Sequence, residues 1–302
     1  MTKPILTLGP CLFNWKLDDW KDFYFKIADE SDFEEVYLGE VICSRRLPFY
    51  ENEIDAIAER LTQSGKKVIR STLALIMNIY EEEALKTVCE NDRYTVEAND
   101  ASALSYIKNK PHYVGPFINI YNEGAAEYMA KQGAQRICLP YELAEDAIEA
   151  ITKNTSAEIE IQTFGRLPLA VSSRCYHARS RGLRKSKCQY VCNEDYDGMD
   201  VQTLELQPFL NVNGTCTMSH SYISLTAESQ HLTNIGVHAF RISPQDCDML
   251  VVNKIWRDLI NKKINAAEAD ALLLENTPNI VYSNGFYHGA EGREFLSADY
   301  LE

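Results

Sequence analysis

A repeated alternation between short apolar segments and longer amphipathic segments limits what this chain can fold into more than any other feature. Over the first two-thirds of the 302 residues, short apolar runs typical of buried strands alternate with runs typical of helices. Ile54, Ile57 and Leu61, for example, recur at the spacing of one helical face. That helical run ends at Gly65, where a left-handed cap carries little strain.

The number of these units predicts a closed barrel. The strand candidates are 5–8, 35–38, 67–73, 94–97, 113–120, 135–139, 158–164 and 237–242. The helix candidates are 18–28, 52–64, 81–90, 100–109, 124–132, 142–153 and 244–261. Repeating βα units imply a parallel sheet, and eight of them predict a TIM-like βα barrel with functional residues at the carboxyl ends of its strands. A doubly wound open sheet is the alternative, but no Gly-rich phosphate fingerprint follows any strand candidate.

The regular pattern is interrupted between residues 166 and 231. The first part of this insertion is irregular and rich in Cys, Arg and Lys, and long loops of this kind are usually functional or tied down by something other than a core. Short strands follow at 201–207, 209–212 and 215–219 and predict a small β insertion. We therefore predict a barrel domain over 1–265 that includes the insertion, and a C-terminal tail over 266–302 packed on or near it.

Charge and hydropathy exclude several classes of protein. With 30 Lys and Arg against 44 Asp and Glu, the net charge is 30 − 44 = −14, which argues against a chain-wide surface for nucleic acids or anionic membranes. The longest nearly uncharged stretch is about half of what a ~20-residue spanning helix needs. The N-terminus lacks the apolar run of a signal peptide. We expect a cytoplasmic protein that does not insert into membranes.

The nine cysteines point to a metal centre. An odd number without an export signal indicates a reducing compartment, where cysteines gather for metal binding or catalysis more often than for disulfides. Cys175, Cys188 and Cys192 lie in the irregular segment, and Cys43 follows the second strand. In a barrel, Cys43 and Cys175 share the carboxyl-end rim, so four thiolates can converge as ligands of an iron–sulfur cluster or of zinc.

Basic residues surround this set in the sequence. Positive charge lowers thiol pKa values and offsets the negative charge of a thiolate cluster, although a solvated basic loop explains the same residues. These residues are Arg45, Arg46, Arg174, Arg179, Arg181, Arg184, Lys185 and Lys187. The cysteines that we expect to bind no metal are Cys11, Cys89, Cys138, Cys216 and Cys247.

The run EIEIQTFGRLPLAVSSRC, residues 158–175, resembles the signature of the collagenase-like peptidase family, a bacterial barrel family that also contains RNA-modifying members. Glu160, Gly165, Ser172 and Cys175 match that signature. The chain departs from it at Phe164, Pro168 and Ser173, which stand where the family has His, Cys and Gly.

These departures, with YLGEVICSRR, STLAL and TMS elsewhere in the chain, resemble the branch of the family that acts in oxygen-independent ubiquinone biosynthesis. The resemblance implies a [4Fe–4S] cluster bound by Cys43, Cys175, Cys188 and Cys192. It also implies a heterodimer with a UbiU-like paralogue, cooperation with a UbiT-like lipid carrier, and hydroxylation of a quinone precursor ring without O2. The chain would then be a subunit of a hydroxylase complex and not a peptidase.

Three other functions stay open from the residues alone. A peptidase-like hydrolase lacks a convincing nucleophile–base pair among the six histidines. An RNA-modification factor is disfavoured by the net charge, though a local basic groove is compatible with it. A zinc-stabilised binding module would use the same cysteines without redox chemistry.

Polar residues at or near the predicted strand ends are candidates for substrate binding, because barrel rims collect functional side chains there. Ordinary caps and turns place the same residue types at strand ends. The candidates are Glu97, Asn119, Asn122, Glu142 and Glu160.

Overall fold

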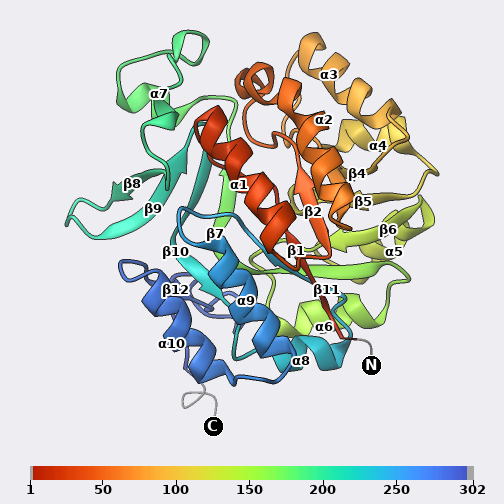
Figure 1. Ribbon diagram of the computed structural model, residues 1–302, viewed down its shortest axis with the longest axis vertical. Helices are drawn as coiled ribbons and strands as arrows, with labels where there is room; N and C mark the ends of the chain where they lie inside the picture. The colour runs from red at the N-terminus through yellow and green to blue at the C-terminus, as the bar shows by residue number, and fades with distance from the viewer. Residues whose placement is uncertain (1–2, 298–302) are drawn as a thin grey trace.

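A closed ring of parallel strands forms the centre of the computed structural model, which describes residues 3–297 (Figure 1). The hydrogen-bonded order is β11-β1-β2-β3-β4-β5-β6-β7, and pairing of β11 with β7 closes it. The strands of the ring are β1 (Ile5–Leu8), β2 (Glu35–Leu38), β3 (Lys67–Ser71), β4 (Thr95–Ala98), β5 (His112–Val114), β6 (Ala134–Cys138), the first part of β7 (Glu158–Val171) and β11 (Ala239–Ile242). The predicted eight-stranded TIM-like barrel is thereby confirmed.

Helices follow the strands and cover the outside of the ring. Most of them share one large apolar core with it, whereas α3 and α4 pack with β4 in a separate apolar cluster. They are α1 (Leu17–Glu30), α2 (Leu47–Gln63), α3 (Ile79–Glu90), α4 (Ala101–Ile107), α5 (Glu123–Lys131), α6 (Glu145–Lys153), α8 (Ser229–Ile235), α9 (Met249–Ile260) and α10 (Ala266–Asn276). Helix α7 (Tyr176–Ser180) lies apart from them, in the cysteine-rich loop above β8 and β9 in Figure 1. Short 3-10 turns occur at η1 (Ser44–Arg46), η2 (Pro116–Ile118), η3 (Lys185–Lys187) and η4 (Val191–Asn193).

Strand β7 is 14 residues long and changes partner midway. Up to Phe164 it pairs in parallel with β11, and beyond that residue it pairs antiparallel with β10 (Cys216–Ser224). Gly165 permits the change: its φ is +101°, and an added Cβ would lie 2.9 Å from the Cβ of Ser243.

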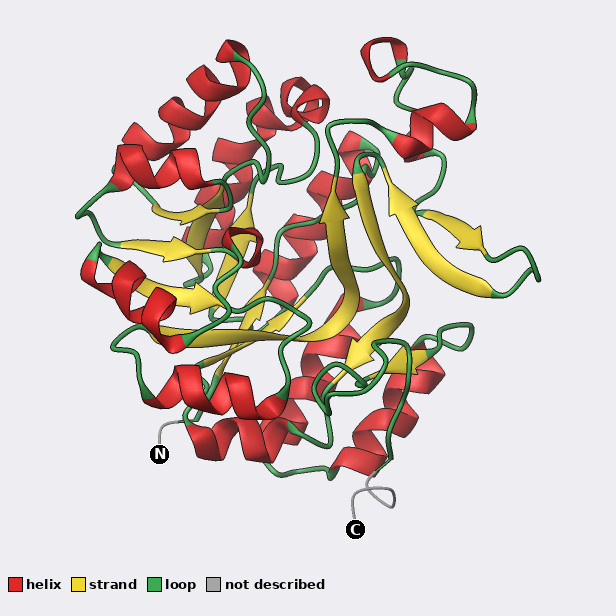
Figure 2. Cartoon of the chain, turned by 180° about the vertical axis from the view of Figure 1, so that it is seen from behind, coloured by secondary structure: helices red, strands yellow, loops and turns green. Residues whose placement is uncertain are grey.

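The second half of β7 extends the sheet outside the ring. Strand β10 pairs with β9 (Pro208–Asn213), and β9 pairs with β8 (Met199–Gln202), both in antiparallel orientation. Strand β12 (Tyr282–Ser283) pairs in parallel with β10 on the side of the C-terminal segment. Figure 2 shows the β8–β9 hairpin projecting away from the barrel. Strands β8, β9 and β10 are the small β insertion that the sequence predicted, whereas β12 lies outside it.

Several boundaries differ from the sequence-based prediction. Helix α2 begins at Leu47 and not at 52, α9 begins at Met249 and not at 244, and the strand predicted at 201–207 is Met199–Gln202. The strand predicted at 113–120 is only His112–Val114, because Gly115 and Pro116 begin η2 and proline has no N–H for a sheet ladder. The segment after 265, which shows little pattern in the sequence, contains α10. This helix begins with a capping box in which Asn265 and Glu268 bond reciprocally to backbone N–H groups.

The barrel interior is charged, whereas such interiors are usually filled by branched apolar side chains. Arg241 pairs with Glu97 at 2.7 Å and with Glu160 at 3.0 Å, and all three side chains are almost fully buried. Tyr37 donates to Glu160 at 2.5 Å. Nearer the amino end, Arg136 pairs with Glu35. The ring is therefore held from inside by buried ion pairs.

We expect Arg241→Met to destabilise the fold by about 3–5 kcal/mol, because it leaves buried carboxylates without their cation. Burial opposes ionisation of Glu160, but the charges of Arg241 and Arg136 outweigh burial and lower its pKa. The carboxylate is therefore charged at neutral pH and becomes unpaired in the variant. Urea unfolding at pH 7 measures the loss. Arg60→Met removes an exposed pair with Asp29 and should change little; equal effects of the two variants would contradict the interpretation.

Candidate functional site

Cys43 lies just beyond the carboxyl end of β2, in a segment fixed by backbone hydrogen bonds. The carboxylate of Glu40 accepts the N–H groups of Ile42 and Cys43, each at 2.8 Å. The hydroxyl of Thr215, in the turn between β9 and β10, donates to the carbonyl of Ile42 at 2.8 Å. The β9–β10 turn is therefore attached to the Cys43 segment, although 173 positions in the sequence separate Ile42 and Thr215.

Cys175 follows β7 and caps the short helix α7. Its sulfur accepts the N–H of Ala178 at 3.3 Å and its thiol donates to the carbonyl of Gly214 at 3.2 Å. Gly214 belongs to the same β9–β10 turn that contacts the Cys43 segment. The turn thus connects the segments that carry two of the predicted ligands.

Cys188 and Cys192 flank a strained piece of backbone that packs against the start of α2. Gln189 and Tyr190 have φ values of 52° and 57°, a left-handed conformation that costs a residue with a Cβ about 1–2 kcal/mol. The Tyr190 ring packs edge-on against Phe49, with 4.6 Å between ring centres. It also lies 5.5 Å from the Arg45 guanidinium. These contacts hold the loop against the residues that follow Cys43.

Two adjacent arginines after Cys43 reach the sulfurs of this loop. The pKa of Arg45 is raised chiefly by its contact with the Cys188 thiol. Arg46 donates to the Cys192 sulfur at 3.7 Å, and its other terminal nitrogen donates to the Leu12 carbonyl at 3.0 Å.

Two asparagines, one from before α1 and one from the β9–β10 turn, complete the contacts of Cys192. Asn14 donates to its sulfur at 3.2 Å. Asn213 accepts from Arg46 and donates to the Cys192 carbonyl at 3.4 Å. Hydrogen bonds of the β9–β10 hairpin thus connect the segments that carry Cys43, Cys175 and Cys192, and Cys188 packs in one cluster with Cys175.

The four thiols are buried and free. Each is 6–7% exposed, and none forms a disulfide. Burial raises the pKa of Cys43, while the nearby Arg46 charge lowers it. Burial also raises the pKa of Cys175; the Ala178 N–H opposes this, and the charges of Cys192 and Cys188 add to it. These contributions place the Cys188 and Cys192 sulfurs within electrostatic reach of Cys175.

The other five cysteines are free and have raised pKa values, although Cys11 and Cys216 lie within electrostatic reach of Arg46 and Glu40. Cys138 is buried in β6, and burial raises its pKa far above the ordinary range. Burial likewise raises the pKa of Cys11, Cys216 and Cys247 to about 12 and that of Cys89 to about 11. Thiols in such surroundings stay protonated and behave as packing residues.

The four sulfurs are not arranged around a single point. Among residues 3–297, no group of three or more His, Cys, Asp or Glu side chains is placed to hold one metal ion. Around one tetrahedral zinc ion with ~2.3 Å bonds, the sulfurs would lie about 3.8 Å apart. A [4Fe–4S] cluster binds one thiolate on each of its four irons, so its ligands stand farther apart.

Unsatisfied donors beside the thiols fit such a cluster. The Nε atoms of Arg45 and Arg46 are buried and find no acceptor in the described part of the chain. Buried donors of this kind normally have partners, and the sulfides and thiolates of a cluster are acceptors. The donor set thus fits a thiolate-bound iron–sulfur cluster, with Cys43, Cys175, Cys188 and Cys192 as the residues that would hold it.

Most of the basic residues around the cysteines lie in solvent. Arg46 is 1% exposed, and Arg45 and Lys185 are half-buried. Lys185 also contributes to lowering the pKa of Cys43. The exposed members are Arg174, Arg179, Arg181, Arg184 and Lys187. The charge that reaches the thiols therefore comes mainly from the two arginines that follow Cys43.

The predicted substrate residues lie in three different environments. Glu97 and Glu160 are fully buried in the ion pairs of the barrel interior. Asn119 ends η2 with a φ of 61°, and Asn122 caps α5 by accepting the N–H of Ala125 at 2.8 Å. Glu142 is exposed and accepts the Tyr121 hydroxyl. The structure does not bring these five side chains together, and their part in substrate binding stays a prediction.

None of the six histidines, all within the described residues, is paired with a serine or cysteine side chain as a hydrolase would require. His177 is buried and pairs with Asp195 at 2.8 Å, and His288 pairs with Glu228 at 2.8 Å. His112 contacts the Lys110 carbonyl. The other three lie beside carboxylates.

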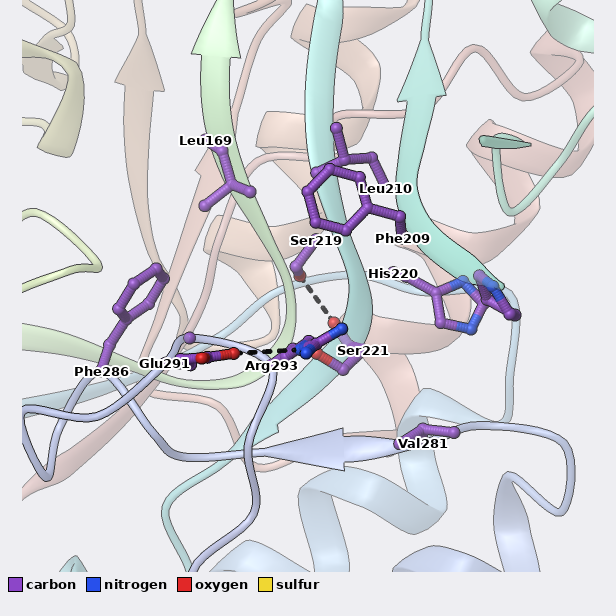
Figure 3. A pocket seen from close by; sticks show the side chains of 12 residues that line it. Leu169, Phe209, Leu210, Ser219, His220, Ser221, Val281, Phe286, Glu291 and Arg293 are labelled. Carbon is purple, nitrogen blue, oxygen red and sulfur yellow. Dashed lines mark hydrogen bonds and ion pairs between the residues drawn. The ribbon is translucent and has the colours of Figure 1, made fainter. Parts of the chain in front are cut away.

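A cavity of about 720 Å³ lies against β7, β9 and β10, on the same strands whose ends carry the cysteine site. Figure 3 shows Leu169, Phe209 and Leu210 at its apolar end, with Glu291 and Arg293 on the opposite side. Along β9, Leu210 lies three residues before Asn213, the last residue of the strand, or about 10 Å at ~3.3 Å per residue. The apolar end thus lies nearer to the cysteines.

Sequence reasoning missed Asn14 and Asn213 as parts of the site. Asn213 lies between the strands predicted at 209–212 and 215–219, where the sequence indicates only a connection. Nothing in the sequence around Asn14 indicates a contact with Cys192. Arg46 was included only as one of several basic residues. Sequence reasoning missed these contacts because Asn14 and Arg46 lie 178 and 146 positions from Cys192. Only the fold brings such distant residues together.

Comparison with known protein families places residues 15–296 within the sequence profile of peptidase family U32. A curated relative is 30% identical over 133 residues, the 23S rRNA 5-hydroxycytidine C2501 synthase of Escherichia coli K12. The match covers 43% of this chain and 20% of that protein, so the chain spans about a fifth of the relative's length.

Solved structures with a similar arrangement are distant in sequence. A truncated 3-deoxy-D-arabino-heptulosonate 7-phosphate synthase from Thermotoga maritima has a TM-score of 0.43 and 15% identity, with 89% of this chain and 88% of that chain covered. A sialic acid aldolase from Aliivibrio salmonicida has a TM-score of 0.43 and 12% identity, with coverages of 92% of this chain and 80% of that chain.

No helix within residues 3–297 is both long and apolar enough to span a bilayer.

We expect Gly214→Ala to disturb the cysteine site specifically. Gly214 has a φ of +64°, and an added Cβ would lie 2.5 Å from a terminal nitrogen of Arg46. Gly182→Ala is the matched control, since Gly182 has a φ of +69° with nothing within 4 Å. Both changes should cost about 1–2 kcal/mol for the left-handed backbone, and Gly214→Ala a further ~1–3 kcal/mol for displacing Arg46.

Urea unfolding gives the two costs, and labelling of native thiols with an aromatic disulfide reports the site. Faster labelling should appear in Gly214→Ala alone. If both variants lose the same stability and label at the same rate, the turn does not hold Arg46 in place.

Proposed function

Because the chain belongs to peptidase family U32, we propose that it is a UbiV-like iron–sulfur subunit for the oxygen-independent hydroxylation of a ubiquinone precursor ring. The observation that carries this proposal is that hydrogen bonds of the β9–β10 hairpin connect the segments of Cys43, Cys175 and Cys192. Cys188 packs in one cluster with Cys175, and all four thiols are buried and free. The family's fold alone does not select a function, because function depends on the site that the fold carries.

The proposed ligands of the cluster are Cys43, Cys175, Cys188 and Cys192. Support comes from the buried thiols, from the two arginines that reach them, and from the unsatisfied Nε donors beside them. When bound, the cluster would supply one-electron redox chemistry. The protein residues would hold it in a site that is shielded from water and compensate part of its negative charge.

A hydroxylation role is supported by the Escherichia coli relative, whose name describes the synthesis of a 5-hydroxycytidine in 23S rRNA. Adding a hydroxyl group to a pyrimidine ring and to a phenolic ring is the same class of change, in which a ring C–H becomes C–OH. The substrate proposed here is a quinone precursor delivered by a UbiT-like lipid carrier. The formal charge of −14 favours this substrate over RNA, whose phosphates a protein of this charge would repel.

RNA modification is the second candidate, and the same relative is the observation that favours it. A hydrolase is disfavoured because the histidines of the described residues pair with carboxylates or backbone and not with a nucleophile. Deletion of the gene under anaerobic growth, followed by analysis of quinones and of rRNA nucleosides, separates the first two candidates. Loss of quinone with unchanged rRNA supports the proposal, and the reverse result contradicts it.

The proposed partner is a UbiU-like paralogue, and apolar surface around the 720 Å³ cavity is where we propose that it binds. Leu169, Phe209 and Val281 line the cavity and are 41%, 50% and 57% exposed. A patch of exposed apolar side chains usually marks an interaction site. The strands beneath it also carry the cysteine-rich loop, so a partner seated there would lie beside the cluster.

Replacing any one of the four proposed ligands by Ala should deplete iron and disable anaerobic quinone synthesis, because a [4Fe–4S] cluster needs a thiolate on each iron. Iron and sulfide are measured on protein purified without oxygen, together with its visible absorbance. Cys138→Ala and Cys247→Ala are the controls, and both should keep wild-type iron apart from modest packing losses. The proposal is contradicted if the wild-type protein is colourless and contains zinc. It is also contradicted if the variant with all four proposed ligands replaced by Ala keeps its iron.

Co-expression with the paralogue should yield a complex that elutes as one species in size-exclusion chromatography. Phe209→Glu should weaken it, because burying an unpaired carboxylate is unfavourable. Tyr128→Glu, a similarly exposed aromatic residue on α5, is the control and should leave the complex intact. Separate elution of the wild-type chains at micromolar concentration counts against the pairing, and equal behaviour of the two variants counts against this surface.

A further inference from the structure

The sulfur of Cys192 is contacted by two buried side-chain donors from distant parts of the chain. Asn14, from the loop before α1, donates its Nδ2 at 3.2 Å, and Arg46, from η1, donates a terminal nitrogen at 3.7 Å. Asn14 is 5% exposed and Arg46 is 1% exposed. Donors buried this deeply act in a low dielectric, where their effect on a charged sulfur is larger than in water.

Both donors are held in place by groups that do not touch the sulfur. The Tyr50 hydroxyl shares its single proton between two acceptors, Asn14 Oδ1 at 2.9 Å and the Trp15 carbonyl at 2.8 Å. Occupying the amide oxygen in this way leaves the Asn14 amide nitrogen to face Cys192. Arg46 is fixed through the Leu12 carbonyl and the Asn213 side chain. The arrangement is therefore preorganised and not a chance surface contact.

The positive charge of Arg46 is only partly compensated by protein carboxylates. Its nearest carboxylate is that of Glu40 at 3.8 Å, beyond hydrogen-bond distance, and its Nε has no acceptor within the described residues. Burial opposes the charged form, and the charges of Glu40, Cys192 and Cys43 outweigh burial and raise its pKa. A buried cation with so weak a partner is costly unless negative charge lies nearby. Thiolates at Cys192 and Cys43 would supply that charge.

We propose that Asn14 and Arg46 are positioning residues that stabilise negative charge on the Cys192 sulfur and so raise the reduction potential of the cluster. This inference rests on the proposed function, since it requires the cluster. Reduction adds one electron to the cluster and makes its sulfurs more negative. Hydrogen bonds and a fixed positive charge stabilise the reduced form more than the oxidised form. Removing either one should therefore shift the midpoint potential to a more negative value.

The first test is Asn14→Leu, which removes the amide donor and keeps a side chain of similar size. Protein is purified without oxygen, iron is quantified, and the midpoint potential is obtained from a redox titration followed by visible absorbance and electron paramagnetic resonance. We expect wild-type iron content with a potential shifted to a more negative value. Tyr50→Phe removes the group that orients Asn14 and should give a smaller shift in the same direction.

The second test separates the charge of Arg46 from its geometry. Arg46→Lys keeps the charge and loses the planar fork, whereas Arg46→Met loses both. We expect the midpoint potential to shift further in the negative direction in Arg46→Met than in Arg46→Lys. Alternatively, Arg46→Met loses its iron and Arg46→Lys retains it. Arg136→Lys is the matched control, because Arg136 is equally buried but pairs with Glu35 and Glu158 in the barrel interior. It should lower stability without changing the potential.

The outcomes distinguish this inference from the proposed function. Unchanged potentials in Asn14→Leu and Arg46→Lys with full iron content would overturn the inference and leave the iron–sulfur proposal standing. A wild-type protein without iron would overturn both. If Arg46→Met does not fold, the midpoint potentials of Asn14→Leu and Arg136→Lys still test the inference. If Asn14 had only a structural role, neither variant would change the potential.

Discussion

The change of partner along β7 is the constraint on which the rest of the structure depends. Its first part must pair with β11 to close the ring, and its second part must pair with β10. A strand that stopped at Phe164 would close the barrel and leave Cys175 without a sheet to support it. Because β7 continues to Val171, it carries the cysteine-rich loop away from the ring, and the β9–β10 turn brings that loop back to the segment after β2.

Buried arginines serve two different purposes in this chain. Arg241 is surrounded by carboxylates at hydrogen-bond distance, so its charge is compensated and its role is to hold the ring together. Arg46 is as deeply buried but has its nearest carboxylate at 3.8 Å and one unsatisfied nitrogen. The first arrangement is complete without a ligand. The second is complete only when negative charge is present on the neighbouring sulfurs, which is the physical reason for regarding it as part of a functional site.

Burial raises the pKa of cysteines inside and outside the proposed site. The pKa of Cys138 in β6 is raised by burial, and the Arg241 charge opposes that effect. The pKa values of Cys43 and Cys175 are also raised by burial, which a guanidinium opposes in one case and a backbone N–H in the other. Burial and nearby charge are therefore similar for both groups. The proposed ligands differ in position, because hydrogen bonds of the β9–β10 hairpin connect the segments that carry Cys43, Cys175 and Cys192.

The sequence by itself determined the barrel and the identity of the four proposed ligands. Hydrophobic periodicity is a local property, so the strand and helix positions of the βα units could be predicted to within a few residues. Three of the cysteines could be selected because they lie where that periodicity fails, and Cys43 because it follows a predicted strand toward the same rim. The family signature around Glu160 and Cys175 is also continuous in the chain. The capping box at Asn265 and Glu268 was a local signal of the same kind, which the weak pattern of the tail concealed.

Only the tertiary structure decided what surrounds the sulfurs and what fills the barrel. Glu97 and Glu160 stand near strand ends in the sequence, but Arg241 draws both into the interior, across separations of 144 and 81 positions. Asn14 meets Cys192 across 178 positions. Contacts of this range arise from ring closure and from the bend of β7, and no local pattern encodes them. The sequence therefore fixes which residues can act as ligands, whereas the fold sets the charge and hydrogen bonding that control their chemistry.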